Sequence, residues 1–295
     1  MKVLDPSSAW QVGLREGVRV AGWLGVLCCL IVAPGVLRAA QPGDLILNEF
    51  NAVTTGNFLG LGSGSDSFLG VVPGNGGNWV ELVVVADHLD VRGWTLEWEN
   101  ADLDNNTGRL VFGQSLLWAD LRAGTLITIR EDDLGAPGFG ALPTDLSFDP
   151  QAGDWWIHIN ADDVGHLFKL GFKVDNDGWA MRILDASSPA NVVQDFVGEN
   201  RPLWAGTAVS SSEVGKLKQN PSAAAAFAAL QNYDDGDSST FGSPNTWAGG
   251  ALVQDLSTLR AQVLAPPAPV PGLLPGLLVL LAALLGFVAF RVLRV

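Results

Sequence analysis

Cysteine is nearly absent from this chain of 295 residues. The only two, Cys28 and Cys29, lie in an apolar segment near the start, and Val26 and Leu27 do not supply the small residue that precedes a lipidated cysteine. If that segment is removed on export, the mature chain has no thiol. This excludes disulfide bonds, a cysteine nucleophile and a thiolate metal site. The core must therefore be stable through burial alone, which its size permits.

Charged residues are also scarce, at 16% of the chain, whereas 35 residues are glycine and 48% are hydrophobic. This balance favours a β-rich protein with many turns over a helical bundle. Basic residues are the rarer charge: residues 41–290 hold 11 of the 17 basic and 29 of the 31 acidic side chains, a net charge of −18. Such a surface repels phosphate, which argues against nucleic acid as a partner.

Residues 1–40 have the layout of a secretory signal peptide. Basic residues come first, an apolar stretch covers residues 20–36, and small residues follow at positions 39–40. A retained transmembrane helix is the alternative, but a Pro-Gly pair at 34–35 interrupts the apolar stretch. We therefore expect cleavage near Ala40 and export of the rest of the chain.

A second apolar segment, residues 273–290, contains no charged residue and is long enough to cross a bilayer as a helix. A buried core helix, the alternative, would need a polar face, which this segment lacks. Residues 291–295 carry two arginines, which predicts a cytoplasmic end. Residues 251–272 are predicted to form a Pro/Ala-rich spacer. This leaves residues 41–250 as one folded domain outside the membrane.

The C-terminal region resembles the PEP-CTERM type of bacterial sorting tail. Val270-Pro271 match the start of that motif, one apolar segment follows, and Arg291 and Arg294 close it, although Gly272 stands where the family has glutamate. The resemblance implies a sorting protease as a partner. We expect an exported protein of the cell envelope, anchored in the cytoplasmic membrane by its C-terminal helix or released and sorted to the outer surface.

Strand signals recur at short intervals between the two ends, separated by Gly, Asn and Asp. The predicted strands cover residues 44–53, 77–85, 94–100, 109–113, 125–132, 154–160, 166–172, 179–186 and 191–197. No internal repeat is visible. Many short strands with such turns predict an all-β sandwich or barrel rather than alternating β-α units.

The stretch NWVELVVVADHLDVRGWTLEWEN, residues 78–100, shows how these strands are built. Side chains alternate between the two faces of a strand. Trp94, Leu96 and Trp98 therefore share one face, while Glu97 and Glu99 share the other. The pattern predicts a buried face and a solvated acidic face. We interpret the stretch as two consecutive strands of one sheet with a single buried face.

The order of several short motifs resembles the lamin tail domain family. The matching runs are Asn48-Glu49, Trp79-Val80-Glu81-Leu82, Leu89-Asp90-Val91-Arg92-Gly93-Trp94-Thr95-Leu96, Leu121 to Thr125, Asn176-Asp177-Gly178, Met181 to Asp185, Val192 to Asp195 and Ser239 to Asn245. The resemblance covers roughly residues 44–247 and implies an immunoglobulin-like β-sandwich. Segments 54–77 and 132–178 exceed a minimal domain, and residues 220–230 read as a short helix that begins at Asn220.

No catalytic or cofactor-binding residue can be nominated. His88, His158 and His166 are the only histidines, and none has a partner at the spacing of a metal-binding helix. We expect them in a turn, in a strand and at a strand start. Glu49 and Glu81 could pair as general acid and base, but the family resemblance makes them sheet residues, which favours structural hydrogen bonding.

Clustered carboxylates are the only signal for a metal. Alternating oxygen ligands suit Ca²⁺, and the candidates are Asp175, Asp177, Asp234, Asp235 and Asp237, with a further group at Asp102, Asp104 and Asn105. The alternative is that these are ordinary turn residues, because Asp, Asn and Gly also form turns. No motif requires a cofactor, so Ca²⁺ is the one ion to which the sequence points.

Tryptophan is abundant, with 11 residues against one tyrosine. Aromatic faces stack on sugars, but they also pack in cores. Both interpretations stay open for Trp118, Trp155, Trp156, Trp204 and Trp247. The sequence as a whole predicts a non-enzymatic, membrane-tethered binding or structural module of the cell envelope or extracellular matrix, whose partner is an extracellular protein or polysaccharide. The alternative is an extracellular hydrolase-associated or carbohydrate-binding protein.

Overall fold

The structure, a computed structural model, describes residues 39–100, 106–131, 144–201, 206–223 and 232–264. The chain divides into two compact units, residues 1–39 and 40–295, and all the described strands lie in the second. Within the described residues no helix is long and apolar enough to cross a membrane. The predicted signal peptide and the predicted span at 273–290 lie outside the described residues, as do most of the predicted helix at 220–230 and the Asp102 group.

The described residues form an all-β structure with two main sheets and one short helix, α2 (Ser257–Leu264). In spatial order the six-stranded sheet contains β12 (Tyr233–Gly236), β11 (Val214–Leu217), β1 (Leu45–Asn51), β3 (Trp79–Val84), β6 (Leu126–Arg130) and β7 (Trp156–Asn160). The five-stranded sheet contains β10 (Val192–Val197), β9 (Trp179–Leu184), β4 (Thr95–Asn100), β5 (Asn106–Phe112) and β8 (Leu167–Leu170). All pairings in these sheets are antiparallel except that of β6 with β7. All nine predicted strands are present.

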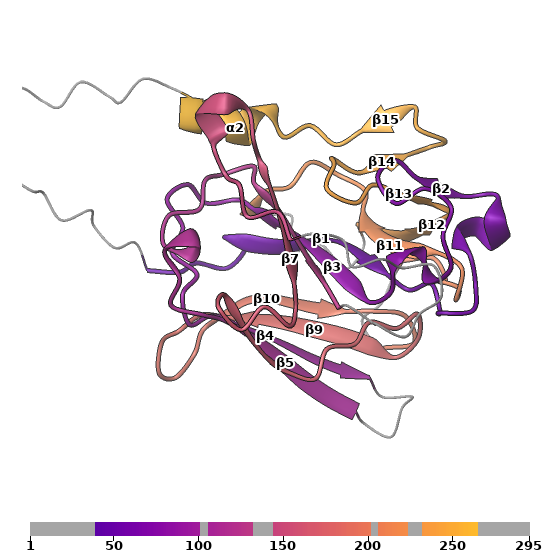
Figure 1. Cartoon of the computed structure of the whole chain (residues 1–295), viewed down its shortest axis with the longest axis horizontal. Helices are drawn as coiled ribbons and strands as arrows, with labels where there is room; N and C mark the ends of the chain where they lie inside the picture. Colours follow the sequence, from indigo (N-terminus) through magenta and orange to yellow (C-terminus); the bar gives the residue numbers. More distant parts are fainter. Residues whose placement is uncertain (1–38, 101–105, 132–143, 202–205, 224–231, 265–295) are drawn as a thin grey trace, which may run out of the picture. The chain divides into compact units, whose positions relative to one another are not determined.

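The two sheets pack face to face around one hydrophobic core (Figure 1). Aromatic side chains make contacts from sheet to sheet: the Phe50 ring of β1 lies 5.0 Å from the Trp179 ring of β9 and 5.4 Å from the Phe196 ring of β10, between ring centroids. Trp94, Leu96 and Trp98 are buried, and Glu97 and Glu99 are exposed, as the alternation predicts. Strand β4 therefore has one buried face and one solvent-exposed face.

A layer of short elements covers the outer face of the six-stranded sheet (Figure 1). It comprises η1 (Leu59–Gly62), the parallel pair β2 (Ser65–Asp66) and β13 (Ser238–Ser239), η2 (Gly74–Gly76), and the hairpin β14 (Thr246–Trp247) with β15 (Leu252–Val253). A second apolar cluster, built from Val53, Leu59, Trp79, Val214 and Phe241, joins this layer to the sheet. The layer explains why every residue of β1 and β3 is buried.

Three predictions about these elements are wrong. Residues 79–84 and 95–100 do not belong to one sheet, because the connection through Gly93 carries the chain from the six-stranded to the five-stranded sheet. Strand β3 is buried on both faces rather than one, since the outer layer covers it. Asp234 and Asp235 lie in strand β12, not in a turn, because β12 pairs with β11 along the edge of the sheet.

The packed region continues beyond residue 250, where the sequence places its end. Gln254 and Leu256 are buried, and the Gln254 amide donates a hydrogen bond of 2.8 Å to the Asn48 side-chain oxygen. In α2, the Arg260 guanidinium lies 5.0 Å from the centre of the Trp155 ring, a cation–π distance. The start of the predicted spacer thus belongs to the folded domain.

Candidate binding cleft

An open cleft of about 420 Å³ lies where the edge of the six-stranded sheet meets the outer layer. Lys216 comes from β11 and Asp235 from β12, while Lys218 and Asp237 directly follow those two strands. The hairpin β14–β15 supplies Trp247. Two sets of residues that the sequence nominates separately, acidic and aromatic, therefore meet in one place.

Lys216 lines the inner end of the cleft. It is almost fully buried, and its Nζ donates to the carbonyl oxygen of Ser238 at 2.6 Å and to the Ser238 hydroxyl at 2.9 Å. Burial lowers the pKa of Lys216, and the carboxylate of Glu49, its partner on β1, acts in the opposite direction. This ammonium group fixes the β13 backbone against the sheet.

Strand β12 supplies the acidic side of the cleft. Asp234 accepts a hydrogen bond of 2.5 Å from Lys218 Nζ. Asp235 accepts one from the Thr207 hydroxyl, and burial, followed by the nearby charge of Asp234, raises its pKa. Asp237 is exposed. The cleft therefore offers both carboxylate acceptors and an ammonium donor to a bound molecule.

Trp247 is half-buried and lies at the start of a turn whose residues have small or no side chains. The next three residues, Ala248, Gly249 and Gly250, all have positive φ, which favours glycine. A side chain added at Gly249 or Gly250 would meet no atom within 4 Å. Because the turn carries so little bulk, the indole of Trp247 stays accessible from the cleft.

Three buried carboxylates anchor the segment that leads into this hairpin. The backbone N–H of Thr240 donates to Glu49, that of Phe241 to Asp66 at 2.9 Å, and that of Gly242 to Glu81 at 2.7 Å. The Thr240 hydroxyl adds a bond of 2.6 Å to Glu49. Consecutive backbone donors thus bind carboxylates from three different elements.

Two amide side chains complete this buried network. Asn48 donates to Glu81 at 2.8 Å, and Asn245 donates to the carbonyl oxygens of Asn48 and Leu217 at 2.9 and 3.0 Å. The β1–β3 register shifts between Leu47 and Glu49, so that a bulge lies at Asn48. This bulge turns the polar side chains of β1 toward residues 240–245.

Glu49 and Glu81 form a buried pair that does not reach the cleft. Both are fully buried, lie opposite each other on β1 and β3, and are absent from the lining of the cleft. Burial raises the pKa of Glu49 from 4.5 to about 7, against the opposing effects of Lys216 and Thr240. Burial and the charge of Glu49 raise the pKa of Glu81. The prediction of structural hydrogen bonding at these positions is confirmed.

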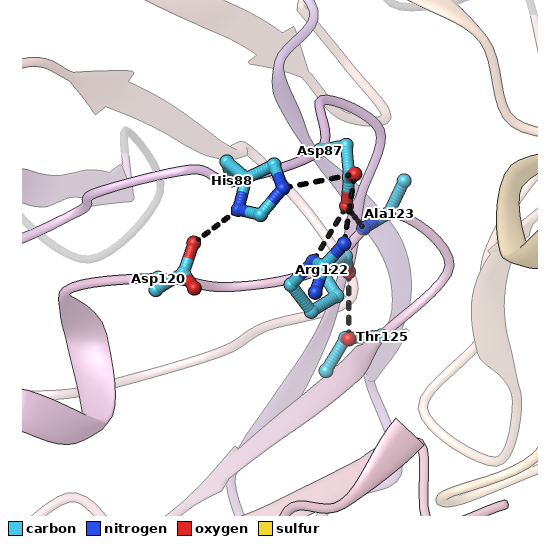
Figure 2. A network of polar contacts seen from close by, with 6 residues as sticks. All are labelled: Asp87, His88, Asp120, Arg122, Ala123 and Thr125. Atoms are coloured by element: carbon cyan, nitrogen blue, oxygen red, sulfur yellow. Dashed lines mark hydrogen bonds and ion pairs between the residues drawn. The ribbon is translucent and has the colours of Figure 1, made fainter. Parts of the chain in front are cut away.

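A separate polar network joins two loops near one end of the sheets (Figure 2). The Asp87 carboxylate accepts hydrogen bonds from Arg122 Nε and Nη2 at 2.8 and 3.0 Å and from the Ala123 N–H at 3.2 Å. His88 Nδ1 lies 2.7 Å from Asp120. Partial burial raises the pKa of Asp87, but the hydrogen bonds from Arg122 and Ala123 outweigh it and hold that pKa below its ordinary value.

The network of Figure 2 has a structural role that the geometry explains. It ties the turn before β4 to the turn that leads into β6, where the Thr125 hydroxyl donates to the Arg122 carbonyl oxygen at 2.7 Å. No serine or cysteine nucleophile is among its members. His88 lies in a turn, His158 in β7 and His166 just before β8, as predicted.

The five candidate Ca²⁺ ligands do not converge. Asp175 lies near Lys173, with 3.4 Å between the charged atoms, and Asp177 accepts a hydrogen bond from Asn200. The other three lie on or beside β12, and Asp234 is paired with Lys218. Among the described residues no group of three or more His, Cys, Asp or Glu side chains is placed to hold a metal ion. Calcium binding stays a prediction.

The tryptophans named by the sequence separate into distinct groups. Trp118 and Trp155 are buried in the core, so they cannot stack on a ligand at the surface. Trp156 is half-buried and stacks on His158 with ring centroids 5.6 Å apart. Trp204 lies outside the described residues. Trp247 is the one that lines the cleft. The sequence did not indicate Lys216 and Lys218, because the run VGKLK has glycine and lysines where a strand signal would have apolar residues.

No protein-family model matches the chain, and no curated protein or solved structure matches it either.

Proposed function

We propose that the chain is a non-enzymatic binding module, exported and held at the cell envelope by its C-terminal segment. Its binding site is the cleft beside β12, and its ligand is a sugar unit of an extracellular polysaccharide. The observation that carries this proposal is the placement of the Trp247 indole beside Lys218, Asp235 and Asp237. An aromatic face can stack on a sugar ring while flanking polar groups bond its hydroxyls.

The charge of the domain narrows the class of ligand. Residues 41–290 carry a net charge of −18, which disfavours the approach of polyanionic polymers. The cleft itself mixes carboxylates with lysines, and this mixture suits the donors and acceptors of neutral hydroxyl groups. We therefore assign it to neutral rather than acidic polysaccharides.

The sandwich is further proposed to be immunoglobulin-like and similar to the lamin tail domain. Supporting this, Asn48 and Glu49 lie in β1, Trp79 begins β3, and Gly93 lies in the turn before β4. The segment 239–245 closes over β1 and β3 through the buried carboxylates. These motif residues thus lie at a strand start, in a turn between the sheets, and where β1 and β3 contact segment 239–245.

Replacing Trp247 by alanine is expected to weaken polysaccharide binding. Truncating a tryptophan at the centre of a binding site costs about 2 kcal/mol, which corresponds to roughly a thirty-fold increase in Kd. Trp247→Phe keeps an aromatic face and should retain most of the affinity. Titration calorimetry against a panel of neutral and acidic polysaccharides measures both.

The matched control is Leu116→Ala, which removes an exposed apolar side chain that does not line the cleft. It should bind as the unmodified chain does. Absence of binding to every neutral polysaccharide, or equal affinity of the Trp247→Ala variant, would refute the proposal and leave an extracellular protein as the partner to test.

A further inference from the structure

The outer face of the five-stranded sheet is exposed and hollowed. A groove of about 700 Å³ runs across it, lined by side chains of all five strands, and shares no lining residue with the cleft beside β12. Exposed apolar groups lie on this face as well, with Phe168 at 55% and Val192 at 40% of full exposure. Exposed apolar surface with polar residues around it is typical of an interaction site.

One row of paired residues crosses this sheet with alternating charge. Starting from Leu170 on the edge strand β8, the row continues through Arg109 on β5, Glu97 on β4, Arg182 on β9 and Asp195 on β10. The four charged residues are all exposed. Arg182 and Asp195 already approach each other to 3.3 Å. The signs are positive, negative, positive, negative in spatial order.

A second row lies two residues away along β8, β5, β4 and β9 and three along β10, where the register shifts, and it contains no charged residue. It consists of Phe168, Val111, Thr95, Leu184 and Val192, each paired with the next across the sheet. The face therefore presents a ladder of charges beside a mainly apolar stripe. Both patterns extend over the same strands.

The charge ladder is complementary to itself. A two-fold axis parallel to the strands and between β4 and β9 exchanges β4 with β9 and β5 with β10. Glu97 of one copy then faces Arg182 of the other, and Arg109 faces Asp195. The same rotation lays the apolar row on itself. We propose that this face binds a second copy of the chain in a two-fold symmetric dimer, which is the commonest closed assembly.

Sheet geometry permits this contact. An axis parallel to the strands keeps the two sheets aligned, and aligned sheets pack about 10 Å apart with their strand directions within about 30° of each other. A twisted sheet is hollow along one diagonal and raised along the other, so the raised diagonal of each copy enters the groove of its partner. The facing strands span only about 20 Å in each direction, which predicts a weak dimer.

Charge also selects this face over the rest of the surface. The domain carries a net charge of −18, so most contacts between two copies are repulsive. On this face three arginines, Arg109, Arg182 and Arg201, balance three carboxylates, Glu97, Glu99 and Asp195. Two copies can therefore meet here without net repulsion.

The test is complementation between two single variants of the full chain, measured by sedimentation equilibrium from about 1 to 200 μM. Glu97→Arg places arginine opposite arginine in the dimer, and Arg182→Glu places carboxylate opposite carboxylate, so each variant alone should be monomeric. An equimolar mixture pairs Arg at 97 with Glu at 182 across the interface. It should recover the wild-type dimer.

Asp120→Arg, a charge reversal on an exposed loop away from this face, should dimerise as wild type does. If either variant loses the β-sheet circular dichroism of the wild type, Arg109→Glu and Asp195→Arg provide a second complementing pair. A monomeric wild type, dimers of the single variants, or a mixture that stays monomeric would each overturn the proposal. Because polysaccharide binding uses other residues, it is scored independently.

Discussion

Replacing Trp179 by alanine is expected to lower the free energy of unfolding by about 3–5 kcal/mol. Trp179 is 2% exposed and belongs to β9 of the five-stranded sheet. Its ring contacts Phe50 of the other sheet, and its indole N–H donates 2.9 Å to the Lys173 carbonyl oxygen. The truncation therefore opens a cavity between the sheets and removes the indole donor from the half-buried Lys173 carbonyl. Urea denaturation followed by far-ultraviolet circular dichroism measures the loss.

Val164→Ala is the control for this substitution. Val164 is 93% exposed in the turn before β8, so its truncation should change the free energy of unfolding by about 0.5 kcal/mol or less. Similar small effects for both variants would mean that Phe50 and Trp179 do not form a common core, and the face-to-face packing of the two sheets would be wrong.

Stability is also expected to fall as the pH rises from 5 to 7. Burial raises the pKa of Glu49 to about 7 in the folded chain, from 4.5 when it is exposed. The folded state therefore binds this proton more tightly than the unfolded state does. The resulting stabilisation is complete below pH 4.5 and is lost as the pH rises through the folded pKa, at about 1.4 kcal/mol per pH unit within that window. Glu81, whose pKa is also raised, acts in the same direction.

Glu49→Gln removes the titrating group and keeps an oxygen acceptor for Thr240, so the dependence of stability on pH should become shallower. Glu97→Gln makes the same carboxyl-to-amide change at an exposed position outside the buried network and serves as the matched control. Carboxyl groups with a lowered pKa, such as Asp87, titrate below this range and do not obscure it. Denaturation midpoints that stay constant or increase from pH 5 to 7 in the unmodified chain would contradict the burial of Glu49.

Alternation of apolar side chains was sufficient to locate nine of the eleven strands in the two main sheets. In β4 the pattern also gave the correct buried face, because one side of that sheet meets solvent. It could not reveal that β3 is covered on both sides, since the covering segments 54–77 and 237–256 are irregular and carry no periodicity. It also could not assign β3 and β4 to different sheets, which depends on the path of a short connection.

Strands β11 and β12 were missed for a different reason. Their sequences, VGKL and YDDG, contain glycine and charged residues that usually form turns. Tertiary packing overrides this tendency: Tyr233 is buried, and its hydroxyl donates to the carbonyl oxygen of Leu47 in β1. The cleft lies beside these two strands, so its lysines could not be assigned to a site before the fold was known.

The signal for the buried carboxylates was present but ambiguous. Glu49 and Glu81 are acidic residues within otherwise apolar strands, a pattern that fits either a catalytic pair or a structural anchor. Which of the two roles applies depends on whether another segment of the chain covers the two carboxyl groups. Thr240 and Gly242, about 190 and 160 residues later in the chain, supply the donors and close the site. Contacts between such distant positions are not visible in one sequence.

The most direct test of the central claim is nuclear magnetic resonance of the tryptophan indole N–H groups during titration with a neutral polysaccharide. The Trp247→Phe variant identifies the Trp247 signal by its disappearance. We expect this signal to move as ligand is added, while the signals of the buried Trp118, Trp155 and Trp179 stay in place. A ligand that binds without moving the Trp247 signal would contradict the assignment of the cleft as the binding site.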